Sequence, residues 1–507
     1  MHLMWFRRDL RINDNTALTE AIRTNEPVIA VFFDSPQQWQ QHELAPIQAD
    51  LIYRRLEELK QELADKFIPL LFISAPLYSD IPSVLQTLCK SLNVRKVWAN
   101  KDYELDETQR DAQVTQSLAN DGVECVFYHD KCLLPPESVK NKSGTFFKVF
   151  TPFKNQYLSL LSGLDVNVNI RSKIDVDKRA QQAIYDDIVH NEQYRAFLGE
   201  GKFGLQYPRT DSQRYTVKTS EIKRLLTDFI QSRVIHYDSR RDFPSVDGTS
   251  QLSPYLAIGA LNVRQCLRAL RNGNINGKIN INGTSACDSE DFHFNTPFES
   301  TGGQIWLSEL IWRDFYQHLQ YHQPTLSKRK SFHDWGYYLQ WDRSPEILEK
   351  WKSGQTGYPI VDAAMRQLNH TGWMHNRLRM VVASFLVKDC LIDWRKGESY
   401  FMQTLIDGDY AANNGGWQWC ASTGCDGQPY FRIFNPTSQS ERFDAEGEFI
   451  RRWVPELAPV PNKYVHTPSK WVEFDSTGYP LPIVDHAKMR KEALLRYKQA
   501  KDFHSKQ

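Results

Sequence analysis

The sequence predicts an α/β amino-terminal domain, a doubly wound parallel sheet of the Rossmann type, followed by an all-α carboxy-terminal domain. Two observations support this prediction. Over residues 1–135, short apolar runs rich in β-branched and aromatic side chains alternate with amphipathic segments, which is typical of βαβ units. Over residues 206–507, the short runs give way to longer segments with helical periodicity.

The five apolar runs of the first domain are its expected strands. The clearest helical pattern between them covers residues 49–63, shortly after Pro46. Ligands of such a sheet bind at the carboxyl ends of the strands, so we expect a binding site there. The five runs are 3–6, 28–33, 70–73, 94–98 and 123–128.

A connector between the domains is expected at residues 136–205, which begin at the pair Pro135-Pro136 and are polar further on. Within this connector, residues 199–204 have the spelling G-x-G-x-x-G. No convincing strand precedes this segment, and Tyr-Pro follows it in place of a helix. We therefore do not interpret it as a dinucleotide-binding motif.

The expected catalytic domain, residues 206–507, contains helical patterns at 305–321 and 373–391. One long interruption, residues 272–303, is rich in Asn, Gly, Ser and Thr. This composition predicts a loop inserted at the surface of the domain.

The overall composition is that of an ordinary globular protein, with 41% hydrophobic and 24% charged residues among 507. The formal net charge of +1 gives no global attraction to nucleic acid, so any DNA-binding surface must be local. Taken alone, this near-neutral charge favours a small-molecule enzyme. Aromatic residues are abundant, at 12% with 14 tryptophans.

None of the eight cysteines forms a C-x-x-C pair, so neither a zinc site nor a redox motif is indicated, and no metal is expected. Charged residues begin at Arg7, too early for a signal peptide. No apolar run approaches ~18 residues, the length that a membrane helix needs. We expect a cytoplasmic protein with reduced thiols.

The stretch 407–419 has the most unusual composition in the chain. Two acids, three amides, three glycines and two tryptophans lie within it, including Asp407, Asp409, Asn413 and Trp417. A buried core segment would be mostly aliphatic, and a loop would not need two indoles. The mixture predicts a site that holds a large, polar, aromatic cofactor close to an aromatic ligand.

Hydroxyl-bearing residues lie just before an expected helix that starts at Ser253-Pro254. Hydroxyls and backbone N–H groups at a helix start can bind an anion such as a pyrophosphate. A plain N-cap explains Ser253 and Pro254 equally well.

In the helical pattern around residues 304–316, Trp306, Glu309 and Arg313 share one face, and Trp312 and Tyr316 share another. This arrangement fits either a structural ion pair beneath aromatic side chains or a functional surface.

Further along, Asn376 and Met380 are helical neighbours flanked by Arg377 and Arg379. They fit a pocket wall beside a phosphate-bearing ligand. The alternative is a methionine that fills the core beside two solvated arginines.

Three further tryptophans, Trp341, Trp394 and Trp417, have no chemical partners nearby in the sequence. On the residues alone, burial in the core is the simplest interpretation.

Taken together and in order, five motifs resemble the photolyase/cryptochrome flavoproteins, and most of all the bacterial class I cyclobutane pyrimidine dimer photolyases with a folate antenna. The resemblance covers almost the whole chain. The motifs begin at Trp5, Thr249, Gly357, Trp373 and Asp407.

The resemblance implies that the helical domain binds FAD. Gln251 departs from the arginine that the family carries there, so its side chain is expected to bind differently. A row of tryptophans, Trp417, Trp394 and Trp341, would carry electrons to FAD, with Trp417 nearest to it. The implied FAD-binding residues are Tyr237, Thr249, Ser250, Gln251, Leu252, Ser253, Trp306, Asp407, Gly408, Asp409 and Asn413.

The resemblance also implies a DNA substrate whose pyrimidine dimer is flipped out of the duplex, which costs less than flipping a normally paired and stacked base. Asn376 and Met380 distinguish this pattern from the (6-4) photolyases, which carry histidines around these positions. The implied catalytic residues are Glu309, Asn376, Met380 and Asn413. The implied DNA-binding residues are Arg241, Glu309, Trp312, Arg313, Tyr316, Asn376, Arg377, Trp419 and Gln439.

For the antenna, the family's pterin contacts correspond to Asp106, Glu107, Ser327 and Lys328. Glu107 and Lys328 match the family pattern, while Asp106 and Ser327 depart from it. Asp106, Glu107 and Lys328 are the expected antenna-binding residues, with methenyltetrahydrofolate bound to residues 1–135.

The expected activity is light-driven repair of cyclobutane pyrimidine dimers by electron transfer from excited reduced FAD, the reaction of a carbon–carbon lyase. A cryptochrome photoreceptor without repair activity is the first alternative, and a DNA-binding flavoprotein that works in the dark is the second. We expect a monomer without an obligate protein partner or membrane contact, associated with the nucleoid of a bacterial-type cell.

Overall fold

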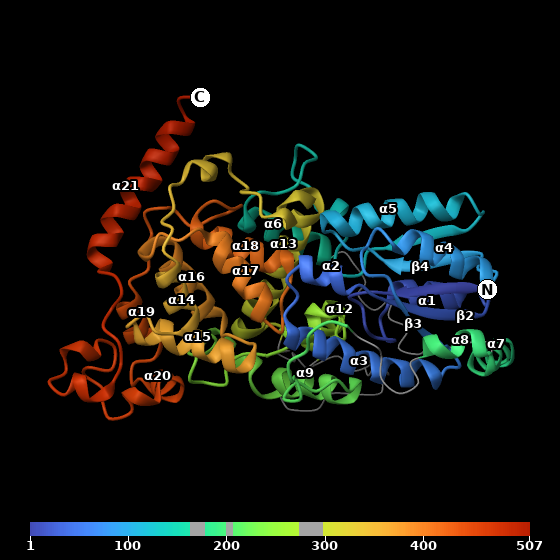
Figure 1. The fold of residues 1–507 in the computed structure, drawn as a ribbon, viewed down its shortest axis with the longest axis horizontal. Coiled ribbons are helices and arrows are strands. Elements are labelled where there is room, and N and C mark those ends of the chain that lie inside the picture. Colours follow the sequence, from blue (N-terminus) through green and yellow to red (C-terminus); the bar gives the residue numbers. More distant parts are fainter. Residues whose placement is uncertain (163–177, 199–205, 273–297) are drawn as a thin grey trace, which may run out of the picture. The chain divides into compact units, whose positions relative to one another are not determined.

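The computed structural model describes residues 1–162, 178–198, 206–272 and 298–507. These residues divide into two compact units (Figure 1). The sheet unit spans residues 1–147, 151–232 and 250–325, and the helical unit spans 148–150, 233–249 and 326–507. The predicted domain boundaries at 135 and 205 stay predictions. The G-x-G-x-x-G segment and most of the 272–303 loop lie outside the described residues.

The sheet unit is built around five parallel strands in the order β3-β2-β1-β4-β5, which confirms the predicted fold class. The fourth strand begins later than predicted, at Lys96. The reason is Val94, which is buried but closes the turn after the preceding helix by donating its N–H to the Cys89 carbonyl at 2.9 Å. The strands are β1 His2–Phe6, β2 Val28–Asp34, β3 Leu70–Ser74, β4 Lys96–Asn100 and β5 Glu124–Tyr128.

Helices flank both faces of this sheet. α4 and α5 lie on one face and α3 on the other (Figure 1). The predicted helix at 49–63 is α3, which starts at Pro46 as proline at N1 favours. The helices are α1 Thr16–Arg23, α2 Pro36–Gln41, α3 Pro46–Ala64, α4 Ile81–Ser91, α5 Leu105–Ala119, α6 Phe150–Ser162, α7 Lys178–His190, α8 Glu192–Arg195, α9 Thr219–Ser232, α11 Ser253–Ala257, α12 Val263–Asn272 and α13 Thr301–His322.

The strand order reverses between β1 and β4, and this is where an α/β sheet opens a crevice for ligands. Charged side chains fill the carboxyl edge at this point. Arg7 pairs with Asp111 at 2.7 Å, and Asp102 pairs with Lys131 at 3.0 Å and with Arg110 at 3.1 Å. Burial alone would raise the pKa of Asp102, but Lys131 and the arginines outweigh it and hold that pKa below its ordinary value.

A second buried charge cluster joins the loop after β5 to the first helix and to α12 within the sheet unit. Asp130 accepts hydrogen bonds from Arg11, Arg264 and the Thr16 hydroxyl. Burial alone would raise the pKa of Asp130, but the guanidinium groups of Arg11 and Arg264 outweigh it and lower that pKa to about 2.

We predict that Asp130→Asn lowers the free energy of unfolding at neutral pH by about 2–3 kcal/mol, at ~1.4 kcal/mol per pKa unit. Because the folded pKa is below the ordinary 3.8, the contribution is complete above about pH 4 and is lost as the pH falls towards about 2. Urea unfolding of both proteins at pH 7 and pH 3 measures this. If the free energies of unfolding of the two proteins differed equally at pH 7 and at pH 3, the role of the Asp130 charge would be contradicted.

The helical unit contains the remaining helices. The periodic segment predicted at 373–391 is α16, Asn376–Ser384, continued by a π-helix at Phe385–Asp389. No described helix is both long and apolar enough to span a bilayer. The other helices are α10 Tyr237–Arg240, α14 Pro345–Ser353, α15 Pro359–Thr371, α17 Trp394–Thr404, α18 Tyr410–Ala421, α19 Pro436–Phe443, α20 Glu448–Trp453 and α21 His486–His504.

Helices α17 and α18 approach each other closely because Gly397 has no side chain. A methyl carbon placed on Gly397 would lie 2.0 Å from Cη2 of Trp417. The Trp417 ring therefore packs directly on the α17 backbone, and Phe401, one turn further along α17, contacts it edge-on with the centroids 5.0 Å apart.

Candidate active site

The acid-rich stretch 407–419 forms the start of α18 in the helical unit. Asp409 is the N-cap, and its Oδ1 accepts from the Ala412 N–H at 2.9 Å. Asp407 is buried and pairs with Arg379, whose Nη2 lies 2.8 Å from Oδ2. One interpretation of the sequence had Arg379 solvated, but in the structure it is paired with Asp407. Gly408, between the two acids, is buried.

The amides of α18 are held by the neighbouring helix. Nδ2 of Asn413 donates to the backbone carbonyl of Glu398 at 3.0 Å. Nδ2 of Asn414 donates to the Glu398 carboxylate at 2.8 Å, and Gln418 donates to Asn414 at 2.7 Å. The orientation of the Asn413 side chain is thus set by a fixed backbone acceptor.

The segment 237–249 is tied to α16 through one ion pair. Nη2 of Arg377 lies 2.8 Å from Oδ1 of Asp242, so this arginine is also paired rather than solvated. This contact brings the predicted residues Tyr237 and Arg241 into the same region as α16. Thr249 is held at its carbonyl by Arg233, at 3.2 Å.

The DNA-binding candidates of the helical unit extend from this region to α19. The guanidinium of Arg377 lies 4.8 Å from the centroid of Phe443, and Phe443 contacts Phe243 at 6.3 Å. Gln439 lies one turn before Phe443 on α19. Asp242 and Phe243 were missed from the sequence, although both lie directly beside Arg241.

Asn376 is exposed at the first position of α16, and Met380 and Trp419 are half-buried against one hydrophobic core. His375 is the N-cap of α16, and its Nδ1 accepts from the Arg377 N–H at 3.2 Å. Burial lowers the pKa of His375 to about 4, so the ring is neutral at pH 7 and serves as an acceptor. Because Met380 is half-buried, it is only partly a core residue.

In the sheet unit, α13 is largely buried except for one stripe. Glu309, Trp312, Arg313 and Tyr316 are half-exposed, and together they form what we call the α13 stripe. Trp312 and Tyr316 lie with their ring centroids 5.7 Å apart. The two faces expected from the sequence are thus one continuous surface, whereas Trp306 is buried against Phe229 at 5.0 Å.

The α13 stripe is anchored by the buried residue that follows Arg313. Asp314 accepts from the Leu133 N–H at 2.7 Å and from the Tyr157 hydroxyl. Arg313 itself donates to the Lys131 carbonyl at 2.7 Å. These bonds restrict rotation of the helix and keep the stripe accessible.

The residues Ser250, Gln251, Leu252 and Ser253 also belong to the sheet unit. The helix predicted after them is α11, with Ser253 and Pro254 in its first turn. Gln251 has a φ of 52°, in the left-handed region that few non-glycine residues adopt. Leu252 is buried, and Ser253 is exposed.

The antenna candidates Asp106 and Glu107 lie in the first turn of α5, where acids are favoured by the helix dipole. Asp106 is engaged by His42, with Oδ2 2.9 Å from Nε2. Glu107 is buried, which raises its pKa, and its Oε2 has no hydrogen-bond partner among the described residues. Lys328 ends a 3-10 turn at Pro324–Lys328.

The three predicted electron-transfer tryptophans belong to one hydrophobic core of the helical unit. Trp394 and Trp417 are buried in it, and Trp341 is half-buried against it. Trp351 contacts Trp417, with the centroids 6.0 Å apart. The guanidinium of Arg395 lies 4.7 Å from the centroid of the Trp394 ring.

Comparison with known proteins agrees with this architecture. Residues 306–499 match a family model described as the FAD binding domain of DNA photolyase, and residues 2–169 match one described as DNA photolyase. A deoxyribodipyrimidine photo-lyase from Vibrio cholerae is 50% identical over 99% of this chain and 100% of its own.

Two solved structures share the fold over nearly all of both chains. A class III photolyase from Agrobacterium tumefaciens is 31% identical, with a TM-score of 0.76 over 99% of this chain and 98% of its own. A Synechocystis cryptochrome is 25% identical, with a TM-score of 0.77 over 97% and 98%.

A parallel-sheet unit followed by a helical unit with an FAD-binding domain defines a flavoprotein of the photolyase type. Identity of 50% over a whole relative then specifies the family, and the chain belongs to the DNA photolyases.

Proposed function

We propose that this protein repairs cyclobutane pyrimidine dimers in DNA by light-driven electron transfer. The observation that carries the proposal is the 50% identity, over its entire length, to a relative named deoxyribodipyrimidine photo-lyase. The α13 stripe supports it, since an acid and two aromatic rings kept accessible on an otherwise buried helix suit a flipped pyrimidine dimer, which stacks and forms hydrogen bonds.

FAD is the proposed cofactor, and the chemistry of the residues fits it. With Nδ2 of Asn413 bound to the Glu398 carbonyl, the Oδ1 of the same amide is an acceptor, which suits the N–H that reduced flavin carries at N5. Asp407 and Asp409 would hold the ribose and the ring edge. When bound and reduced, FAD supplies the electron that light transfers to the dimer.

The remaining FAD contacts are proposed at residues 249–253, at Tyr237 and at Trp306. Backbone N–H groups of 249–253 would hold the phosphates. The side chain of Gln251 therefore need not do what the family's arginine does at this position. Tyr237 and Trp306 would pack against the cofactor.

Binding of the dimer is proposed to use stacking and phosphate contacts. Trp312 and Trp419 would stack on the flipped bases, at roughly 1–3 kcal/mol per base, which offsets the few kcal/mol that flipping costs. Arg241, Arg377 and Gln439 would contact the strand. Asn376 and Met380 would line the cavity without donating a proton, and His375 stays neutral in its capping role.

We predict that Glu309→Ala lowers the quantum yield of repair by roughly tenfold while changing dimer affinity less. In its protonated form the Glu309 carboxyl can donate a hydrogen bond to the dimer and would stabilise its negative charge, and such bonds contribute about 1.5–3 kcal/mol. Repair yield and binding of an irradiated oligonucleotide are measured on the chemically reduced protein. Glu309→Gln, which keeps a donor, should retain most of the yield, and an unchanged yield in Glu309→Ala would refute the assignment.

The proposed antenna is methenyltetrahydrofolate. The acceptor oxygen Oε2 of Glu107, buried without a hydrogen-bond partner among the described residues, would bind a pterin N–H. Asp106 would help to position the ring through His42, and Lys328 would contact the folate. Absorption of the purified protein, with folate expected near ~380 nm and flavin near ~450 nm, tests both cofactors.

Trp417, Trp394 and Trp341 are proposed to carry electrons inward to the cofactor. Their placement in one core, from two buried rings to one half-buried ring, supports this order. We further propose that the protein acts as a monomer in the cytoplasm, where its DNA substrate lies.

The decisive experiment illuminates reduced protein with irradiated oligo(dT) and measures restored thymines. Repair that requires light supports the proposal. Unchanged oligonucleotide with flavin bound would point to a cryptochrome, and repair in the dark would point to a different flavoprotein.

A further inference from the structure

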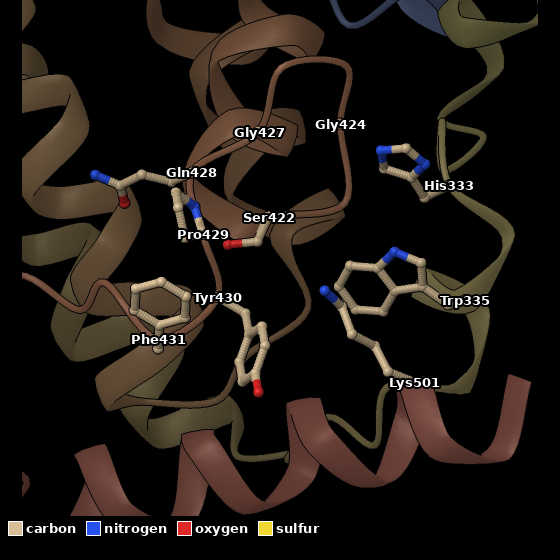
Figure 2. A pocket seen from close by; sticks show the side chains of 10 residues that line it. All are labelled: His333, Trp335, Ser422, Gly424, Gly427, Gln428, Pro429, Tyr430, Phe431 and Lys501. Atoms are coloured by element: carbon tan, nitrogen blue, oxygen red, sulfur yellow. The ribbon is translucent and has the colours of Figure 1, made fainter. Parts of the chain in front are cut away.

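A pocket of about 340 Å³ lies in the helical unit and is lined by none of the residues assigned above, although Gln428 in its wall donates its N–H to the Trp419 carbonyl at 3.1 Å (Figure 2). Its walls come from residues 333–335, from the loop 422–431 and from α21, which contributes Lys501. The volume is within the range of small-molecule sites, which begins at ~300 Å³. Trp335, Tyr430 and Phe431 give the pocket aromatic walls, and Phe431 is 62% exposed.

The pocket combines these rings with one positive charge. Nζ of Lys501 lies 4.9 Å from the centroid of Trp335 and 4.6 Å from that of Tyr430. In the described part of the chain no carboxylate is paired with Lys501. Burial, together with Lys501 and Lys148, lowers the pKa of His333 in the same wall, so that ring is neutral. An anion with an aromatic ring satisfies both features, whereas a cation would be repelled.

The floor of the pocket is rigidly built. Lys388 is completely buried and donates to the Ser422 hydroxyl at 2.9 Å and to the carbonyls of Tyr430 and Arg432 at 3.4 and 3.3 Å. The His333 N–H donates to the Thr423 carbonyl at 3.0 Å. These bonds hold the loop in shape, which lowers the entropic cost of binding.

The walls of the pocket also connect to the tryptophan row. Tyr430 stacks on the buried Tyr497 with an interplanar angle of 5° and centroids 6.2 Å apart. Trp335 contacts Tyr497 at 6.0 Å, and Tyr497 contacts Trp341 at 6.4 Å. One aromatic ring therefore separates the pocket from Trp341, the outermost member of the row.

We propose that this pocket binds a small planar aromatic anion that acts as the one-electron donor to Trp341, an inference that rests on the electron-transfer role proposed above. The donor, a dihydroxyaromatic carboxylate, loses one electron, and its hydroxyl proton goes to water. The electron passes across Tyr497 to the Trp341 radical cation and returns that indole to its neutral state.

The kinetic test uses 3,4-dihydroxybenzoate and follows the decay of the tryptophan radical after a flash. In the native protein the decay rate should saturate with concentration, because a bound complex forms. Catechol, which lacks the carboxylate, should give a linear dependence. Lys501→Gln should abolish saturation and slow the decay roughly tenfold at low concentration, the loss expected for one ion pair of about 1.4 kcal/mol.

Lys498→Gln is the matched control, since Lys498 is exposed on the same helix and does not line the pocket. It should behave as the native protein. A linear dependence on 3,4-dihydroxybenzoate in the native protein, with photoreduction intact, would overturn the donor role.

Calorimetry with benzoate tests the pocket independently of the flavin. Heat of binding should appear in the native protein and in Lys498→Gln, and should disappear in Lys501→Gln and Trp335→Leu, with melting temperatures checked to confirm folding. Absence of binding to the native protein would overturn the inference. If no tryptophan radical forms at all, the electron-transfer role proposed for the three tryptophans fails instead, while the calorimetric result still decides whether the pocket binds aromatic anions.

Discussion

Replacing Trp417 by phenylalanine is expected to slow light-driven reduction of the bound flavin by on the order of a hundredfold, which corresponds to about 2.7 kcal/mol in barrier. Benzene rings are much harder to oxidise than indoles, so the row loses its first donor. Repair by chemically reduced protein should be unchanged, because that electron does not come from the row. Photoreduction under steady blue light and repair after dithionite reduction measure the two effects separately.

Trp351→Phe provides the matched control. Trp351 is completely buried in the same core and contacts the ring of Trp417. The two substitutions therefore remove the same atoms from adjacent positions. Trp351→Phe should keep photoreduction, and loss of chemically driven repair in Trp417→Phe would show that the ring serves the structure of the site rather than electron supply.

The second large effect is expected at Gly397. Gly397→Ala places a methyl carbon where the Trp417 ring now lies, 2.0 Å from Cη2, so α17 and α18 must move apart. Overpacking of a close-packed core costs about 1–3 kcal/mol, and occasionally more. We expect a lower free energy of unfolding and, because Trp417 is displaced, weaker photoreduction as well.

Gly416→Ala is the control for stability, since a methyl carbon there has nothing within 4 Å. Replacing a helical glycine by alanine should leave the free energy of unfolding unchanged or raise it by up to about 1 kcal/mol. Denaturant unfolding of the three proteins measures this. Equal stability of Gly397→Ala and the native protein would mean that the helices are less constrained than the contact implies.

The sequence was sufficient for the sheet and for helices such as α3 and α16, since these are local patterns. Apolar runs and helical periods repeat over a few residues. The sequence was insufficient where distant residues meet. The pairs Arg379–Asp407 and Arg377–Asp242 join positions far apart in the chain, so both arginines could only be predicted as solvated or phosphate-binding.

Other differences have equally physical causes. The π-helix at Phe385–Asp389 has the same apolar pattern as the α-helix before it, so no periodicity reveals it. Val94 was predicted to lie in a strand because it is apolar, but in the structure it is buried in the turn after α4. The pocket at Lys501 unites three distant segments, none of which has an unusual composition.

The guanidinium of Arg395 above Trp394 has a consequence for the direction of charge flow. In the proposed row, a radical cation on Trp394, its middle member, would lie 4.7 Å from the positive guanidinium of Arg395, a repulsion of up to about 3–4 kcal/mol at an effective dielectric constant of ~20. Asp393, 3.2 Å from Arg395, offsets part of it. The radical cation should therefore leave Trp394 quickly and stay on Trp341. Its return through Trp394 would be slow, and charge recombination with the flavin would be slowed as well.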